Sequence, residues 1–467
     1  MDSTTNLKKG NEIIVQIASL AFGGQGIARY NNIVVFVKNG IPGQKLKILI
    51  IKKSKKYFEA KILEIITESI HYQKPPCEHF KYCGGCSFQN LDYKIQTQQK
   101  LNQIKEIFNR IGEQKDFIIE PIKICDNTYQ YRNKMEFTFS NRRWILKDEP
   151  ENVKSDFALG LHIPGRYDKI LNINNCHIQK DAANEILNIV KQYSSGMEPY
   201  DILEHKGFLR NLMIRHAENT NEIMVNIVTA FENTKKLKSL THKIVEKIEN
   251  VKSIVNNITS RKSGVSKGEY EINLYGENFI QEIINGLTFN ISANSFFQTN
   301  TKQTENLYSM IIDESNLAGN EIVYDLYCGT GTIGICLAQY VKEVYGFEIN
   351  ESAVNDAIIN AQLNNIKNIK FFKGDLQNIF RVNLDTRKIQ KPDIIIIDPP
   401  RAGMHKKTIL DIIKKEPKKL IYISCNPGTQ ARDIKELSQN NYKLKKVLPL
   451  DMFPHTPHVE NIAILEK

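Results

Sequence analysis

Four cysteines in the first half of the chain have the spacing of metal ligands. Three of them form the motif Cys77-x5-Cys83-x2-Cys86. Gly84-Gly85 lies inside this motif, and glycines allow the tight bend that turns three sulfurs toward one centre. Cys176 is the expected fourth ligand, although His79 or His177 could complete a zinc site instead. The spacing alone suits zinc and an iron–sulfur cluster equally well, so it predicts a metal centre of either kind.

A fifth cysteine, Cys425, has the surroundings of a nucleophile. It follows the apolar run 420–423 in Ser424-Cys425-Asn426-Pro427, which predicts a thiol at the carboxyl end of a buried strand. Ligands of α/β sheets bind at such strand ends, so a thiol there is well placed for covalent catalysis.

Glu460, in His458-Val459-Glu460 near the C-terminus, is the candidate general base. A thiol and a base together suit a reaction on uracil. Carbon 5 of uracil becomes nucleophilic only after a thiolate has added to carbon 6, and the carbon 5 proton must later leave so that the thiolate is expelled. His455 and His458 could also serve as the base, but a histidine beside a proline in a loop is more often structural.

A glycine-rich turn between these motifs is of the kind that holds a nucleotide-like cofactor. The apolar run 322–326 leads into Tyr327-Cys328-Gly329-Thr330-Gly331-Thr332-Ile333-Gly334, and an acid, Glu348, follows Gly329 by 19 positions. Glycines let the backbone approach a ligand, and the acid can bind ribose hydroxyls. The same Gly-x-Gly-x-x-Gly pattern would also fit a nicotinamide dinucleotide.

The segment Asp398-Pro399-Pro400-Arg401 favours a methyl donor over a dinucleotide. It follows the predicted fourth strand, and an Asp-Pro-Pro turn at that place resembles S-adenosylmethionine enzymes that act on nucleobases. Asp398 is expected to bind the uracil edge or to orient the reacting groups. Asp375, after the third strand, falls where a contact to adenine is expected, although it could equally be an ordinary loop acid.

Alternating strand and helix patterns after Asn294 predict the domain that positions these residues. Apolar runs of the parallel-strand type occur at 322–326, 343–347, 369–372, 393–397 and 420–423. They predict a doubly wound, Rossmann-like α/β domain over residues 291–467, with its ligands at the carboxyl ends of the strands.

Residues 1–66 consist of short strand-like runs separated by glycine and asparagine turns. These runs, at 11–17, 33–37, 45–52 and 57–66, predict a small OB-like β-barrel. The segment has eleven Lys and Arg against four Asp and Glu, so it is a candidate surface for RNA backbone, with a solvated lysine face as the alternative. Its run 22–29 resembles the TRAM domain, an RNA-binding barrel of RNA-modifying enzymes.

The middle of the chain, 67–290, is predicted to be a mixed α+β domain that carries the cysteine motif. A helix is expected over 92–111, where apolar residues recur at helical spacing, and 129–282 is rich in strand patterns.

Composition limits the class of protein. A chain of 467 residues is expected to form two or three domains. It has no uncharged apolar run long enough for a bilayer and no signal-peptide core, so a cytoplasmic protein without a membrane partner is expected. Its eight cysteines are then expected to be free or metal-bound, and its net charge of +11 suits a polyanionic partner.

Taken in order, the motifs resemble the RNA 5-methyluridine (uracil-C5) methyltransferase family. The resemblance covers essentially the whole chain and is closest to the iron–sulfur, TRAM-bearing branch that modifies 23S ribosomal RNA. The segments that carry it are Cys77, Cys83, Cys86, Cys176, Ser295-Phe296-Phe297-Gln298-x-Asn300, Asp325-Leu326-Tyr327-Cys328-Gly329, Asp398-Pro399-Pro400-Arg401, Ser424-Cys425-Asn426-Pro427 and His458-Val459-Glu460.

The resemblance implies a role for many of these positions. Cys425 would be the nucleophile and Glu460 the base in methyl transfer from S-adenosylmethionine. The residues expected at the donor are Gln298, Tyr327, Thr332, Glu348, Asp375 and Asp398, although relatives often have Asn at the position of Thr332. The expected ligands of a [4Fe–4S] cluster are Cys77, Cys83, Cys86 and Cys176. The family also suggests that residues 95–120 pack on the catalytic domain and that the protein is a monomer.

The chemistry also constrains the RNA. A paired or stacked uracil hides carbon 6, so the target must be flipped into the pocket or lie in a loop. Phe296 or Phe297 could stack on it, and Arg132 and Lys134 could contact phosphates. Two alternatives are the same reaction on transfer RNA, and an iron–sulfur RNA-binding protein without turnover.

Overall fold

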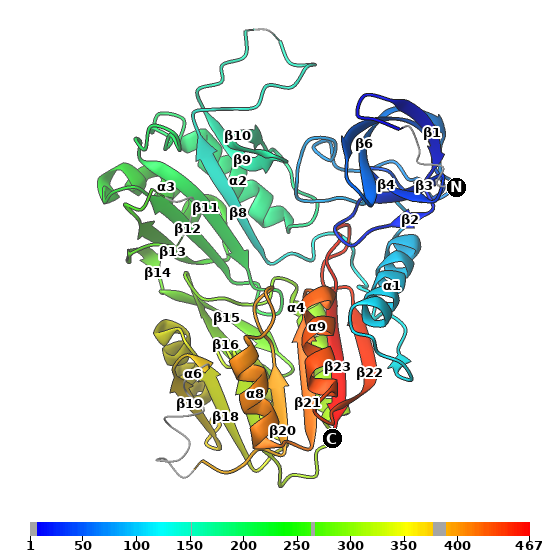
Figure 1. Cartoon of the computed structure of the whole chain (residues 1–467). Helices are drawn as coiled ribbons and strands as arrows, with labels where there is room; N and C mark the ends of the chain where they lie inside the picture. Colours follow the sequence, from blue (N-terminus) through cyan, green and yellow to red (C-terminus); the bar gives the residue numbers. More distant parts are fainter. Residues whose placement is uncertain (1–6, 151, 263–266, 377–388) are drawn as a thin grey trace.

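The computed structural model describes residues 7–150, 152–262, 267–376 and 389–467. Figure 1 shows three parts along the chain: a small barrel, a central sheet with two helices, and a C-terminal α/β unit. Within the described ranges, none of the helices combines the length and apolar character that crossing a membrane requires.

The N-terminal part is a six-stranded sheet in the order β1-β5-β6-β4-β3-β2. Its strands are β1 (Glu12–Gln16), β2 (Ser19–Leu20), β3 (Gly26–Tyr30), β4 (Ile33–Lys38), β5 (Lys45–Lys53) and β6 (Tyr57–Thr67). Successive side chains of a strand point to opposite faces, so Val35, Ile48 and Phe58 fill the interior while Lys45 and Lys61 are exposed. The barrel therefore presents cations outside a closed apolar core.

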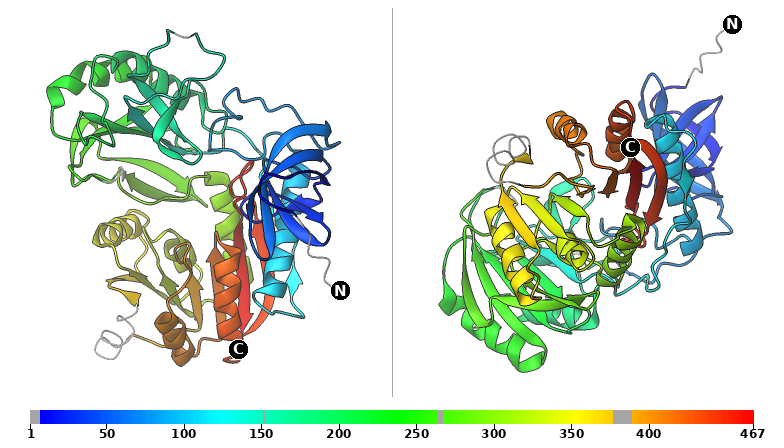
Figure 2. Two further views of the ribbon diagram at one scale, coloured as in Figure 1. Left: turned by 45° about the horizontal axis from the view of Figure 1, so that its top comes forward. Right: turned by 90° about the horizontal axis from the view of Figure 1, so that it is seen from below.

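One helix and one short strand follow the cysteine segment. They are α1 (Tyr93–Arg110) and β7 (Ile118–Ile119). The carboxylate of Asp92 caps α1 by accepting the backbone N–H groups of Lys94 and Ile95. Ile104 and Phe108 of α1 are buried in the core of the C-terminal unit, which attaches this segment to that unit. In both views of Figure 2 the barrel lies beside α1.

The central part is a seven-stranded sheet in the order β10-β9-β8-β11-β12-β13-β14. Its strands are β8 (Lys134–Ser140), β9 (Ala158–Ile163), β10 (Arg166–Asn172), β11 (Leu209–His216), β12 (Ile223–Thr229), β13 (Val251–Ile258) and β14 (Tyr270–Gly276). The apolar sides of α2 (Asp181–Tyr193) and α3 (Thr234–Lys247) pack into one core with the sheet. Every residue of β11 and β12 is buried, as expected for inner strands covered on both faces.

The C-terminal part is an eight-stranded sheet in the order β19-β18-β17-β20-β21-β23-β22-β7. Its strands beyond β7 are β17 (Ile322–Leu326), β18 (Glu343–Glu348), β19 (Ile369–Lys373), β20 (Ile394–Ile397), β21 (Lys419–Ser424), β22 (Lys443–Leu450) and β23 (Glu460–Glu466). Strands β17 to β21 are parallel, and β23 inserts antiparallel between β21 and β22. The strand order reverses at β17, and ligands of such sheets bind at this switch point.

Helices and a hairpin complete the C-terminal part. The helices are α4 (Thr301–Ser315), α5 (Thr332–Ala338), α6 (Glu351–Leu363), α8 (Lys406–Lys415) and α9 (Pro427–Ser438), and the hairpin is β15 (Phe279–Ile284) with β16 (Leu287–Ser292). The alternation of strands and helices from β17 to α9 confirms the prediction of a doubly wound α/β domain.

Candidate active site

The glycine-rich turn at the end of β17 forms a crevice at the switch point. Tyr327 has φ of 62°, a conformation that is rare for a residue with a side chain. Gly331, with φ of 78°, precedes α5, and a Cβ atom there would lie 2.8 Å from the ring of Phe371. Asp325 Oδ2 accepts the backbone N–H of Gly334 at 2.9 Å, and burial raises the pKa of Asp325 to about 8. The turn is thus held by its own strand and by the neighbouring sheet.

Glu348 lies at the carboxyl end of β18, beside the turn. Its Oε2 accepts the backbone N–H of Gly329 at 3.1 Å and its Oε1 that of Asn350 at 2.8 Å. Thr332 opens α5, and its hydroxyl is 2.6 Å from that of Tyr308. The three expected donor contacts Tyr327, Thr332 and Glu348 therefore belong to one turn and the strand next to it.

The other expected donor contacts come from three different segments. Asp375 follows β19, two residues before the undescribed segment 377–388. Asp398 follows β20, and its backbone N–H donates to the carbonyl of Leu326 at 3.3 Å, next to the glycine turn. Gln298 lies in the loop before α4, and its carbonyl accepts the side-chain amide of Asn133 at 3.0 Å.

The two phenylalanines before Gln298 differ in exposure. Phe297 is 4% exposed and lies in the core of the C-terminal unit. Phe296 is 72% exposed, so it is the one of the two that can stack on a base.

Cys425 lies between β21 and α9. Asn426 caps α9 by accepting the backbone N–H of Gly428 at 3.1 Å, which fixes the turn that carries the thiol. The side chain of Arg401 donates a hydrogen bond to Cys425. Burial, followed by the nearby carboxyl of Glu460, raises the pKa of the thiol, while Arg401 opposes this shift. Arg401 thus lies where it can stabilise a thiolate, a role that sequence reasoning missed although its motif was noted.

Glu460 is the first residue of β23, next to the strand that carries Cys425. The register of β21 and β23 places Ser424 opposite Asn461, which brings Cys425 and Glu460 together. Glu460 is 4% exposed, and burial together with Asp398 raises the pKa of its carboxyl well above its usual range. Burial also raises the pKa of Asp398 to about 7. Neighbouring carboxyls with raised pKa values suit proton transfer near neutral pH.

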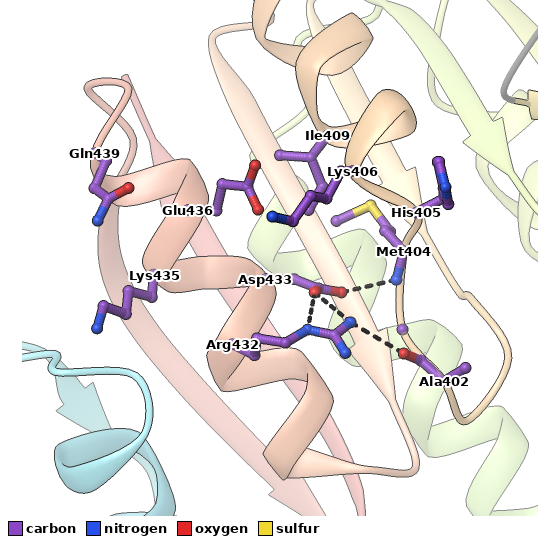
Figure 3. A pocket seen from close by; sticks show the side chains of 11 residues that line it. Ala402, Met404, His405, Lys406, Ile409, Arg432, Asp433, Lys435, Glu436 and Gln439 are labelled. Atoms are coloured by element: carbon purple, nitrogen blue, oxygen red, sulfur yellow. Dashed lines mark hydrogen bonds and ion pairs between the residues drawn. The ribbon is translucent and has the colours of Figure 1, made fainter.

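The loop between β20 and α8 is fastened to one face of α9 (Figure 3). Asp433 Oδ2 accepts the backbone N–H of Met404 and the hydroxyl of Tyr422, both at 2.8 Å. Arg432 contacts Asp433 and donates to the carbonyl of Ala402 at 3.0 Å. The carbonyl of Arg401 accepts from Asn426 and Thr429. The helix that follows Cys425 therefore also holds the loop that carries Asp398 and Arg401.

Residues 451–459, which we call the junction loop, join β22 to β23 and end at Glu460. Lys100 Nζ on α1 donates to Asp451 Oδ1 at 2.6 Å, and both side chains are almost completely buried. His455 is 1% exposed and its Nδ1 lies 3.2 Å from Gln96 Nε2, so this histidine has a structural place away from any substrate. Burial, reinforced by Arg401 and Lys100, lowers the pKa of His458. Burial also lowers the pKa of His455, to about 4.

The four cysteines predicted as ligands line one cavity. Cys77, Cys83, Cys86 and Cys176 face it together with His79 and His177. All four thiols are free, and burial raises the pKa of Cys83 to about 11 and that of Cys86 to about 12. His79 Nε2 accepts the backbone N–H of Asn174. Among the described residues, no three such side chains are close enough to hold a single metal ion. Four thiols around a shared cavity nevertheless match the donor set of a larger iron–sulfur group.

The fold and the crevice define the class of this protein. A doubly wound sheet, a glycine turn at its switch point and an acid at the end of the next strand are typical of enzymes that bind a nucleoside-containing cofactor. With a thiol and a carboxyl beside that crevice, the class is an S-adenosylmethionine-dependent methyltransferase.

Comparison with known proteins identifies the family. Residues 175–467 match the family described as tRNA (uracil-5-)-methyltransferase, and residues 6–63 match the TRAM domain. An RNA methyltransferase of Chlorobaculum tepidum is 38% identical over 91% of this chain and 90% of its own. One of Porphyromonas gingivalis is 37% identical over 97% of this chain and 99% of its own. The chain belongs to the S-adenosylmethionine-dependent RNA uracil-C5 methyltransferase family.

A solved structure shares the whole architecture. It is the tRNA (uracil-54, C5)-methyltransferase of Pyrococcus abyssi in complex with S-adenosyl-L-homocysteine. The two are 27% identical with a TM-score of 0.76, over 97% of this chain and 100% of the other. The similarity confirms the predicted fold class and the choice of a methyl donor over a dinucleotide.

Proposed function

We propose that this enzyme methylates carbon 5 of a uridine in 23S ribosomal RNA, with Cys425 as nucleophile and Glu460 as base. The observation that carries the proposal is the pairing of β21 with β23, which brings thiol and carboxyl together beside the glycine turn. The hydrogen bond from Arg401 supports a thiolate at Cys425.

The chemistry follows from this arrangement. The thiolate of Cys425 adds to carbon 6 of uracil and the electron pair moves to carbon 5 and the O4 carbonyl. Carbon 5 attacks the methyl group that S-adenosylmethionine would supply, and the bond from that methyl group to sulfur breaks with its electron pair left on sulfur, so S-adenosylhomocysteine leaves. The carboxylate of Glu460 then takes the carbon 5 proton, the electron pair of that C–H bond forms the C5–C6 double bond, and the Cys425 thiolate leaves. The two side chains thus act at different steps.

The donor site would be built from the turn and the strand ends around it. We assign the ribose hydroxyls to Glu348 and the adenine to Asp375, with Tyr327 and Gln298 as further contacts. Asp398 lies between the donor turn and Cys425, which suits it to orient the reacting groups. The hydroxyl of Thr332 is already engaged with Tyr308, so its contact to the donor would be the weakest of the set.

RNA would lie across the barrel and the central sheet. Exposed cations of the barrel suit the backbone, and Phe296 would stack on the flipped uracil. Lys134 is close to Arg132 and Arg215, and burial together with these two cations lowers its pKa to about 8. The three neighbouring positive charges favour a phosphate there.

We further propose that the four cysteines hold a [4Fe–4S] cluster. Their shared cavity and free thiols support it. The cluster would link the 77–86 segment to the central domain, because Cys176, its fourth ligand, belongs to that domain. Anaerobic purification should yield iron and acid-labile sulfide in equal amounts; zinc without sulfide would contradict the assignment.

Transfer RNA is the second candidate substrate, because the P. abyssi enzyme acts on it. The cysteine motif together with the barrel favours ribosomal RNA by the resemblance set out above. Mapping of 5-methyluridine in both RNAs, from cells with and without the gene, decides between them. Loss from 23S ribosomal RNA is expected; loss from transfer RNA alone would overturn the substrate, and two unchanged maps would overturn the activity.

A further inference from the structure

Gln96, on α1, lies 359 positions before His455 in the sequence, yet it contacts the junction loop. It is fully buried and uses both ends of its amide. Its Oε1 accepts the backbone N–H of His455 at 3.1 Å, and its Nε2 lies 3.2 Å from His455 Nδ1. The same Nε2 donates to the carbonyls of Phe88 at 2.9 Å and Leu91 at 2.7 Å, just after Cys86. One side chain thus ties together α1, the cysteine segment and the junction loop.

His455 needs such support because its backbone is strained. Its φ of 63° is uncommon for a residue with a side chain, and such conformations persist only when neighbours hold them. The backbone N–H groups of Ser87 and Phe88 donate to its carbonyl at 2.7 and 3.0 Å. The ring of Tyr129 stacks on its imidazole with 4.5 Å between centroids. The strained residue is therefore held from three segments outside its own hairpin.

We propose that Gln96 is a positioning residue for the general base, because it sets the path of the junction loop into Glu460. The inference rests on the proposed role of Glu460. Only four residues lie between His455 and Glu460, and Pro457 among them limits the ways in which the loop can compensate. A shift at His455 is thus transmitted to the carboxyl.

The step that Gln96 should affect is removal of the carbon 5 proton. Addition of Cys425 and methyl transfer depend on β21, α9 and the donor crevice. The side chain of Gln96 instead makes its hydrogen bonds to Phe88, Leu91 and His455. If the carboxylate of Glu460 is displaced, the proton stays on carbon 5 and the bond between Cys425 Sγ and carbon 6 is not broken. The methylated enzyme–RNA adduct should then accumulate.

The test compares Gln96→Met with Gln99→Met on the same helix. Gln99 Oε1 accepts the backbone N–H of Leu20 in the barrel, so its loss weakens a contact of α1 that does not reach the junction loop. Each full-length variant is given 23S ribosomal RNA and transfer RNA transcripts made with uridine or with 5-fluorouridine. Turnover of labelled S-adenosylmethionine, the KM for RNA and the adduct that survives denaturation are measured.

For Gln96→Met we expect turnover to fall about tenfold or more, an adduct with ordinary uridine RNA, and an unchanged KM. The 5-fluorouridine adduct, whose formation needs no proton removal, should form at the wild-type rate. Gln99→Met should give no uridine adduct. Wild-type turnover in Gln96→Met, or loss of both adducts in Gln96→Met and in the milder Gln96→Asn, would overturn the positioning role. Absence of a 5-fluorouridine adduct with the wild-type enzyme would instead overturn the proposed function.

Discussion

Cys425 and Glu460 lie side by side, but different parts of the molecule hold them. The turn at Cys425 is fixed by α9 and by the loop 398–404, all within the C-terminal sheet and its helices. The path into Glu460 is fixed by α1, by the segment after the cysteine motif and by Tyr131 of the central part, whose hydroxyl donates to the carbonyl of Pro454 at 3.0 Å. The barrel also lies next to the junction loop, because Gly24 packs against Phe88 and Pro457.

This difference shows that two neighbouring side chains of one site can be held in different ways, one by contacts within a single domain and the other by contacts between several parts of the chain. In the proposed mechanism, the side chain for the addition step is held by one folded domain, whereas the side chain for product release is held by contacts from several parts of the chain.

The largest effects should come from the two reacting side chains. Cys425→Ala should lower methylation by about 10⁴-fold or more and abolish every adduct, because no thiolate remains to add to carbon 6. Glu460→Gln should lower turnover by about 10²–10⁴-fold but leave the adduct with ordinary uridine RNA. Denaturing gels of labelled RNA with each variant measure both. If the two variants behaved alike on the gel, the division of labour would be wrong.

Breaking the buried ion pair at the start of the junction loop should be the next largest effect. Lys100→Met leaves the carboxylate of Asp451 buried without its cation, which should destabilise the protein by about 3–5 kcal/mol. Urea unfolding monitored by fluorescence measures this, with the exposed Lys105→Met on the same helix as control. Restoring neutrality in Lys100→Met/Asp451→Asn should recover part of the loss. A midpoint equal to that of the control would show that the loop does not depend on α1.

Asp433 offers a way to disturb the loop 398–404, which lies next to Cys425. In Asp433→Asn an amide replaces the carboxylate that accepts hydrogen bonds from Met404, Tyr422 and Arg432. An amide has only one acceptor oxygen, so it cannot accept from all three donors as the carboxylate does. Displacement of the loop that carries Asp398 and Arg401 should lower turnover by about 10- to 100-fold. No uridine adduct should build up, in contrast to Gln96→Met.

The control for Asp433→Asn is Glu436→Gln, since Glu436 lines the same groove one turn further along α9 (Figure 3). It should keep the wild-type rate. Accumulation of the uridine adduct in Asp433→Asn would contradict the separation of the two sides.

A change of pH replaces no side chain, so it is the mildest perturbation of the site. The pKa of Cys425 is raised, so the thiolate fraction increases with pH throughout the neutral range. Burial raises the pKa of Asp398 to about 7 and also raises that of Glu460, so these carboxyls lose their protons as pH rises. Both trends have the same sign, and kcat/KM should rise by up to about tenfold per unit between pH 6 and pH 8. A profile that is flat or falls over this range would contradict the protonation states described here.

Much of the catalytic sheet was predictable because its strands are buried on both faces. The five predicted runs became β17 to β21 with shifts of one residue at most, since inner parallel strands are nearly continuous apolar segments. The helix over 92–111 was predicted closely for a similar reason, as its apolar stripe and the cap at Asp92 are local signals. The two-residue strand β2 gave no such signal.

The site was predictable only in its parts. Cys425 was predicted as the nucleophile because a thiol at a strand end is a local pattern, and Glu460 as the base because His458-Val459-Glu460 resembles a motif of the family. The strand of Glu460 was not predicted, and neither was its place beside β21, because pairing between strands joined by α9 and β22 depends on the order of the whole sheet. Gln96 was read as part of an ordinary helix, since a polar residue carries no sign of a partner 359 positions away.

The sequence by itself determined the chemistry available to this protein: a thiol, a carboxyl, a glycine turn and a motif of three cysteines, each recognisable from its close neighbours in the chain. Only the tertiary structure decided which of these groups meet and what holds them. Buried polar side chains such as Gln96, Lys100 and Asp433 must find hydrogen-bond partners when water is removed, and those partners are supplied by distant segments. The reactive groups can be read from short segments of the sequence, whereas their positions depend on buried contacts between segments that are far apart in the chain.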